Sequence, residues 1–267
     1  VALIDGVTMG GGVGISMPAR FRVATENTTY AMPETGIGLF PDVGGGWYLP
    51  RKPENIGMWL ALTGARLKAA DCLIAGIATH YLPTEILAAA RAQIAGAAQT
   101  HDAAKALESG LNALHESAGR PRELLPENVG LIDRVFALDS VEAIFAALDS
   151  TPFERVKVVE AEPGEWAQAQ LATLRTKSPQ TLKVTFRQLR EGAHMASFAD
   201  EMRQEYRIAC RVSSRHDFQE GVRAVVIDKD NAPKWNPPTL EAVTDEMIEH
   251  IFAPLPEGEE WTPLPIE

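Results

Sequence analysis

Two hydrophobic patterns divide the chain, and the change between them falls near Pro53. Before this point, short β-prone runs separated by Gly, Asn and Pro predict strands at residues 1–4, 21–25 and 29–32. Between the first two strands, residues 11–17 predict a short helix that begins at glycines. After Pro53, apolar residues recur at helical spacing, so the rest of the chain is predicted to be mainly α-helical.

The predicted helices are separated by residues typical of helix ends. Gly64 and Gly76 follow periodic apolar stretches and are candidate C-terminal stops, whereas Ser178 before Pro179 predicts a helix start. Asp217 is a further candidate N-cap. The predicted helices cover residues 58–62, 68–75, 85–97, 125–138, 139–149, 163–176, 179–193, 197–214 and 217–227.

Composition places the chain among globular proteins and restricts its partners. Of its 267 residues, 45% are hydrophobic and 23% are charged, which excludes disorder and fibrous repeats. The formal net charge of −11 repels nucleic acid, although backbone N–H groups can still bind a small anionic ligand. No apolar run approaches the ~20 residues of a membrane span, so no membrane partner is expected.

The cysteines indicate the compartment in which the protein acts, and the first residues indicate whether the chain continues upstream. Only Cys72 and Cys210 occur, without metal-ligand spacing, so we expect no disulfide framework, no metal and a reducing compartment. That compartment is the cytoplasm, or the mitochondrion in a eukaryote. The chain begins directly with a predicted buried strand and no Met, so we expect further residues upstream.

A glycine run, Gly10-Gly11-Gly12, lies between a predicted strand and a predicted helix. Glycines let backbone N–H groups approach a ligand oxygen closely, which makes the run a candidate binding loop. Ile15 stands where a dinucleotide fingerprint requires its last Gly, and no Gly-Lys-Ser/Thr follows, so nucleotide-binding motifs are disfavoured. Tight turn packing alone remains an alternative.

Two carboxylates, Glu34 and Asp42, lie eight positions apart in a segment otherwise dominated by apolar residues and Gly. Desolvation and like-charge proximity raise the pKa of one carboxyl, which suits it to acid or base chemistry near neutral pH. The alternative is structural: Asp42 as the N-cap of a helix starting near Val43, and Glu34 as a solvated turn residue.

Other polar residues carry weaker signals. The six His residues show no metal spacing, and Ser16 does not lie in a Gly-x-Ser-x-Gly elbow. Four basic residues on one helical stretch are interpreted as a solvated face, with anion contact as the alternative: Lys177, Lys183, Arg187 and Arg190.

The chain resembles the crotonase, or enoyl-CoA hydratase/isomerase, superfamily. Three runs carry the resemblance: Gly10-Gly11-Gly12, Ala31-Met32-Pro33-Glu34-Thr35 and Gly38-Leu39-Phe40-Pro41-Asp42-Val43-Gly44-Gly45-Gly46. Residues 217–230, followed by Pro233-Lys234-Trp235, are similar to the C-terminal region of a hydrolase branch of this superfamily. The resemblance spans nearly the whole chain.

The resemblance implies an α/β fold of two parts. Residues 1–100 would form a core of repeated ββα turns that lacks its N-terminal part, and residues 101–267 a mainly helical region packed on that core. The superfamily binds an acyl-CoA, so coenzyme A belongs to the substrate and no separate cofactor is implied. Its members often self-associate, which makes a homo-oligomer an open expectation.

The resemblance also implies roles for four residues. The thioester carbonyl would lie between two backbone N–H groups, of which Gly11, beside Gly10, matches the second donor. The first donor lies upstream of this chain. Glu34 and Asp42 match the two acting carboxylates of the hydrolase branch.

Departures from the superfamily pattern indicate the reaction. Hydratases usually carry Gly-Gly-Gly-x-Glu, and dienoyl-CoA isomerases also carry an acid at that place, where this chain has Gly14. The resemblance therefore implies hydrolysis of a short β-hydroxyacyl-CoA thioester, a step of valine breakdown. The alternatives are hydration or isomerisation of an enoyl-CoA, or a non-catalytic acyl-CoA-binding fragment.

Overall fold

The computed structural model describes residues 1–119, 121, 125, 128–150 and 163–264. The chain forms two compact units, each built from two segments: unit 1 comprises Val1–Ala31 and Arg66–Asn128, and unit 2 comprises Met32–Ala65 and Val129–Glu267. The predicted division cuts the chain once, at residue 100. Each observed unit instead combines two segments that are separate in the sequence.

Unit 1 contains two small parallel sheets. One has the strand order β1-β3-β5, and the other pairs β2 with β4. Their bounds are β1 Ala2–Ile4, β2 Val7–Thr8, β3 Arg22–Ala24, β4 Thr29–Tyr30 and β5 His80–Tyr81. In the first sheet, Leu3 lies opposite Val23, which lies opposite His80. Corresponding strands of successive chain turns thus pair in parallel, as the predicted ββα repeats require.

The three strands predicted in the first 32 residues are confirmed, as is the short helix α1, which begins in the glycine run between the first two of them. Strands β2 and β5 were not predicted, because two residues are too short to show an alternating pattern. The helices of unit 1 are α1 Gly11–Ser16, α4 Ala69–Ile74, α5 Leu87–Ala97 and α6 Ala103–Ser117, with a 3-10 turn at Thr84–Ile86.

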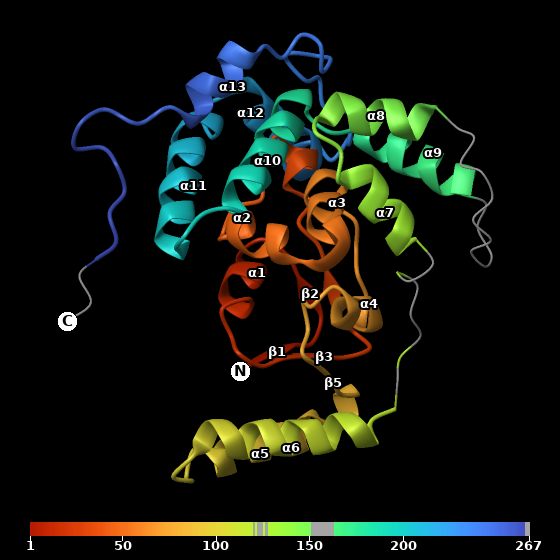
Figure 1. Cartoon of the computed structure of the whole chain (residues 1–267), viewed down its shortest axis with the longest axis vertical. Coiled ribbons are helices and arrows are strands. Elements are labelled where there is room, and N and C mark those ends of the chain that lie inside the picture. Colours follow the sequence, from red (N-terminus) through yellow and green to blue (C-terminus); the bar gives the residue numbers. More distant parts are fainter. Residues whose placement is uncertain (120, 122–124, 126–127, 151–162, 265–267) are drawn as a thin grey trace. The chain divides into compact units, whose positions relative to one another are not determined.

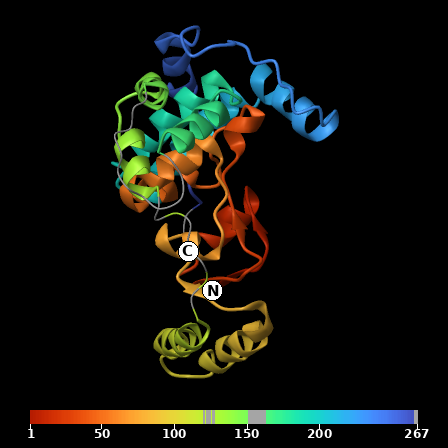
Figure 2. The same ribbon diagram turned by 90° about the vertical axis from the view of Figure 1, so that its right-hand side faces the viewer.

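The helices α5 and α6 lie side by side and cover the sheet end of unit 1 (Figure 1 and Figure 2). Their apolar faces meet Phe21, Val23 and Leu82 in one buried cluster that includes Leu87 and Leu111. Burial of such side chains contributes about 1.5–3 kcal/mol each, so this cluster stabilises the packing of α5 and α6 on the sheet.

Unit 2 is helical, as the periodicity predicts. Its short turns are η1 Glu34–Ile37, η2 Leu49–Arg51 and η3 Pro53–Asn55. Its helices are α2 Gly45–Tyr48, α3 Ile56–Thr63, α7 Val129–Phe136, α8 Val141–Asp149, α9 Pro163–Leu174, α10 Pro179–Gly192, α11 Phe198–Val212, α12 His216–Val222 and α13 Asp245–Phe252, with a π-helical turn at Arg223–Ile227. Every residue of α3 is buried, which explains its continuous apolar sequence.

Helix α10 begins where the sequence predicts. Ser178 is its N-cap and accepts a hydrogen bond from the Thr181 N–H at 3.2 Å, and Pro179 is the first helical residue. The prediction of Asp217 as an N-cap is wrong, because α12 begins after Arg215 without a side-chain cap. The Asp217 carboxyl instead accepts the Ser178 hydroxyl at 2.5 Å, so it ties α12 to the start of α10.

Candidate active site

Glu34 is the first residue of η1, and the sequence around it fixes this turn in unit 2. Gly38 ends η1 in a left-handed conformation, with φ of 69°. A Cβ at Gly38 would lie 2.1 Å from the carbonyl oxygen of Asp217, so only glycine lets the turn pack against α12. The Thr35 hydroxyl donates to the Leu62 carbonyl at 3.1 Å and joins the turn to α3.

Burial gives the Glu34 carboxyl unusual acid–base properties. Its side chain is 5% exposed, and among the described residues its Oε2 atom has no hydrogen-bond partner. The pKa of Glu34 is raised to about 8, mainly because its carboxyl loses hydration; a backbone N–H opposes this rise, and the negative charge of Asp42 adds to it. The alternative interpretation of Glu34 as a solvated turn residue is therefore wrong.

Asp42 lies in the turn before α2, and the structure brings its charge within range of Glu34. Asp42 is half-buried, and burial raises its pKa. Its carbonyl oxygen accepts the Gly45 N–H at 2.9 Å. The N-cap of α2 is Gly44, without a side-chain cap, so the alternative of Asp42 as an N-cap is also wrong.

Two further buried carboxyls, Glu201 and Glu205 on α11, lie against this turn and were not predicted from the sequence. The Glu205 Oε2 accepts the Gly44 N–H at 2.8 Å. The Gln188 Nε2 lies 3.4 Å from the Glu201 Oε1 and donates to the Pro41 carbonyl at 3.0 Å. An acidic pair one helical turn apart is ordinarily a solvated helix face, so only the placement of α11 shows that both are buried.

The glycine run lies in unit 1. Gly10 precedes α1 with φ of 48° and ψ of −123°, a conformation that glycine adopts without strain. Gly11 is the first residue of α1, and no acceptor among the described residues takes its N–H. A Cβ at Gly11 would meet no atom within 4 Å. These features suit an N–H group that donates to a bound ligand. That Gly11 acts on the same thioester as Glu34 and Asp42 stays a prediction.

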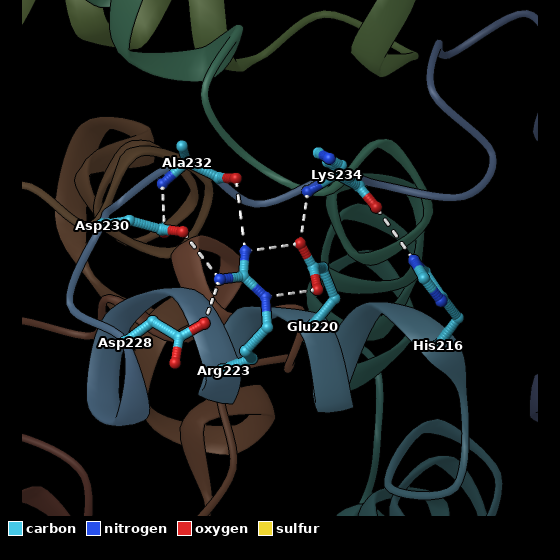
Figure 3. A network of polar contacts seen from close by, with 7 residues as sticks. All are labelled: His216, Glu220, Arg223, Asp228, Asp230, Ala232 and Lys234. Atoms are coloured by element: carbon cyan, nitrogen blue, oxygen red, sulfur yellow. Dashed lines mark hydrogen bonds and ion pairs between the residues drawn. The ribbon is translucent and has the colours of Figure 1, made fainter.

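Arg223 holds together the C-terminal segment, residues 217–235, that is similar to the hydrolase branch of the superfamily (Figure 3). Its guanidinium binds both oxygens of Glu220 at 2.8 Å, and also reaches Asp228 at 2.6 Å and Asp230 at 2.7 Å. Hydrogen bonds from Arg223 and from the Lys234 N–H lower the pKa of Glu220 to about 2. This network folds the segment after α12 back onto it.

The interpretation of the basic stretch on α10 as a solvated face is wrong. Lys183 pairs with Glu142 at 2.6 Å, and Arg187 pairs with Glu249 at 2.7 Å. Arg190 donates to two carbonyl groups at the end of α7, and burial lowers the pKa of Lys177. Lys183, Arg187 and Arg190 thus connect α10 to neighbouring elements of unit 2, whereas Lys177 lies before the helix and is half-buried.

Neither a metal site nor a membrane span is found in the described part of the chain. No group of three or more His, Cys, Asp or Glu residues there is arranged to hold a metal ion. None of the described helices combines the length and the apolar character needed to cross a bilayer.

Comparison with known proteins identifies relatives over nearly the whole chain. The sequence model of the family described as enoyl-CoA hydratase/isomerase matches residues 1–252. Two vertebrate relatives are named "3-hydroxyisobutyryl-CoA hydrolase, mitochondrial". That of Gallus gallus is 46% identical over 260 residues, covering 96% of this chain and 63% of the relative. That of Xenopus tropicalis is 45% identical over 257 residues, with the same two coverages.

A plant relative and two solved structures extend the comparison. "Probable 3-hydroxyisobutyryl-CoA hydrolase 2" of Arabidopsis thaliana is 39% identical and covers 99% of this chain and 68% of the relative. A carnitinyl-CoA dehydratase from Mycobacterium thermoresistibile superposes with a TM-score of 0.80 at 36% identity, covering 96% of this chain and 68% of that one. An enoyl-CoA hydratase from Rhodobacter sphaeroides gives a TM-score of 0.78 at 36% identity, covering 97% and 69%.

Proposed function

This chain belongs to the enoyl-CoA hydratase/isomerase family, and we propose that it hydrolyses 3-hydroxyisobutyryl-CoA to 3-hydroxyisobutyrate and coenzyme A, a reaction of valine breakdown. The chain spans 63% of the length of the vertebrate hydrolases it matches. The observation that carries the proposal is the buried Glu34 carboxyl, whose Oε2 atom has no partner in the described part of the chain and which the charge of Asp42 reaches. In a eukaryote the protein would act in the mitochondrion, as the names of the two vertebrate relatives state for them; otherwise it would act in the cytoplasm.

Charge development on the thioester oxygen defines the first task of the site. Attack at the carbonyl carbon places negative charge on that oxygen, and backbone N–H donors stabilise it. We assign Gly11, beside Gly10, as one of two donors because its N–H has no acceptor among the described residues. Removal of one such donor ordinarily costs ~10²–10³ in kcat.

The second task is activation of the attacking oxygen, which we assign to Glu34. As a general base, its carboxylate takes a proton from water while the water oxygen bonds to the carbonyl carbon. As a nucleophile, it bonds to that carbon itself, and water then hydrolyses the anhydride. In both routes the C–S bond breaks, coenzyme A leaves as a thiolate, and the thiolate takes up a proton.

Asp42 completes the proposed site. Its carboxyl would orient the substrate hydroxyl or the water, or share a proton with Glu34, in which case the two groups titrate as a pair. No cofactor beyond the coenzyme A of the substrate enters this mechanism. A non-catalytic acyl-CoA-binding role would leave the burial of Glu34 without a purpose, because it is costly to bury a carboxyl whose Oε2 atom meets no hydrogen-bond donor among the described residues.

Hydration of an enoyl-CoA is the second candidate function, because the two similar solved structures are of a carnitinyl-CoA dehydratase and an enoyl-CoA hydratase. Against it, Gly14 stands where hydratases of this family carry an acidic residue. The relatives named as hydrolases also share more of the sequence, at up to 46% identity against 36% for the two structures.

A substrate panel with two readouts on the full-length protein tests the proposed reaction. We expect thiol release from 3-hydroxyisobutyryl-CoA and 3-hydroxypropionyl-CoA, with much slower release from acyl-CoAs that lack the 3-hydroxyl. Enoyl-CoA absorbance, followed in parallel, should show no hydration. Loss of that absorbance without thiol release would establish the hydratase alternative instead.

A further inference from the structure

The turn that carries Asp42 contains two consecutive residues in the left-handed region. The φ angle is 54° at Val43 and 84° at Gly44. Glycine adopts such angles freely, whereas a β-branched residue does so only when its surroundings enforce it. Consecutive left-handed residues also direct their N–H groups to one side, where an anion can bind both.

Glu205 supplies that anion from α11. Its Oε2 accepts the Gly44 N–H at 2.8 Å, and the neighbouring Val43 N–H lowers the pKa of the same carboxyl group, as a nearby donor does. The Glu205 side chain is 7% exposed, so little water competes for these hydrogen bonds. Hydrogen bonds from N–H groups to a carboxylate are roughly twice as strong as those between neutral groups.

Neighbouring groups favour the charged state of Glu205 over that of Glu201. Burial raises the pKa of Glu201 to about 8 and that of Glu205 to about 7, and the Gly44 N–H that donates to Glu205 opposes the rise there. The Gly44 N–H thus stabilises the carboxylate of Glu205, whereas the Oε2 atom of Glu201 has no hydrogen-bond partner among the described residues. The other charged groups that act on this pair are Asp42 and Arg51.

We propose that Glu205 is a positioning residue for Asp42: its carboxylate accepts the Gly44 N–H, interacts with the Val43 N–H, holds the left-handed turn, and so directs the Asp42 carboxyl toward the thioester beside Glu34. The proposal rests on the proposed function, because Asp42 acts on substrate only in that reaction. Glu205 itself touches no substrate and acts through the backbone.

Substitution of Glu205 by glutamine tests the proposal. The amide has one acceptor oxygen, and its NH₂ group cannot accept the second N–H. We expect Glu205→Gln to lower kcat for thiol release by about 10-fold to 100-fold with a smaller change in KM, as expected when a reacting group is displaced. The matched control is Gln204→Met, at the preceding and equally buried position of α11, where the side chain bonds to Glu191 instead.

A second variant separates positioning from simple stabilisation. Val43→Gly removes the strain at the left-handed position, so the turn depends less on Glu205. In the Val43→Gly background, Glu205→Gln should therefore cost less kcat than in the unaltered protein. An equal loss of kcat in both backgrounds, or a loss matched by Gln204→Met, would overturn the proposal.

The Gly44 amide NMR signal distinguishes failure of this proposal from failure of the proposed function. Glu205→Gln should shift this signal, and Gln204→Met should not. An unmoved Gly44 signal overturns the positioning role whatever the enzyme does. If the unaltered protein releases no thiol, the proposed function fails and the catalytic consequence of Glu205 fails with it, whereas a shifted Gly44 signal still shows that Glu205 holds the turn.

Discussion

Replacing Glu34 with glutamine is expected to lower kcat for thiol release by ~10³-fold or more, because the amide can act neither as base nor as nucleophile. The amide keeps the shape of the carboxyl, so binding of acyl-CoA should change little. A thiol-release assay gives kcat, and calorimetric titration with the acyl-CoA gives the affinity.

The control for Glu34→Gln is the same exchange at an exposed position. Glu246→Gln, on the surface of α13, should leave both kcat and affinity near those of the unaltered protein. If Glu34→Gln retains full kcat, Glu34 has no part in the reaction. If it loses affinity in proportion to turnover, its role is in binding rather than in chemistry.

Gly221→Ala is expected to destabilise the fold strongly. A Cβ at this position of α12 would lie 2.2 Å from the carbonyl oxygen of Ile37, a contact between two backbones that no side-chain rotation relieves. We expect a loss of about 3 kcal/mol in the free energy of unfolding, at the upper end for overpacking. Because Ile37 belongs to the same turn as Glu34, thiol release should fall as well.

Gly96→Ala is the matched control, since Gly96 is exposed in α5 and its Cβ would meet no atom within 4 Å. At this exposed position, the last but one of α5, alanine should stabilise the protein by at most about 0.5–1 kcal/mol. Chemical unfolding of both variants gives the comparison. Equal stability of the two variants would show that α12 does not pack on the Glu34 turn as described.

Most of the fold could be predicted because its elements carry local signals. The apolar periodicity of the helices and the Ser178-Pro179 start of α10 are properties of the sequence itself. Helix α6 also carries such a signal, with Leu107, Leu111 and Leu114 at helical spacing, but it was not among the predicted helices. The paired residues of β5 give no local signal, because their role depends on a strand 57 positions earlier in sequence.

The residues of the candidate site likewise include some with a local sequence signal and some without one. Glu34 and Asp42 could be singled out because two acids stand in an apolar, Gly-rich segment, and such surroundings remove water from a carboxyl. Glu201 and Glu205 could not, because they stand among other charged residues on an amphipathic helix. Only the contact of α11 with a turn 161 positions earlier in sequence buries them.

The pH dependence of kcat/KM for thiol release tests the role of the Glu34 carboxyl most directly. Burial, reinforced by the charge of Asp42, raises the pKa of Glu34 to about 8, and the ionised form is the one that can attack or take a proton. The active fraction therefore grows as pH rises, and kcat/KM should increase with pH and level off above about 8. A profile already level from about pH 6, with its only rise near the ordinary glutamate value of ~4.3, would contradict the assignment of Glu34 as the reacting group.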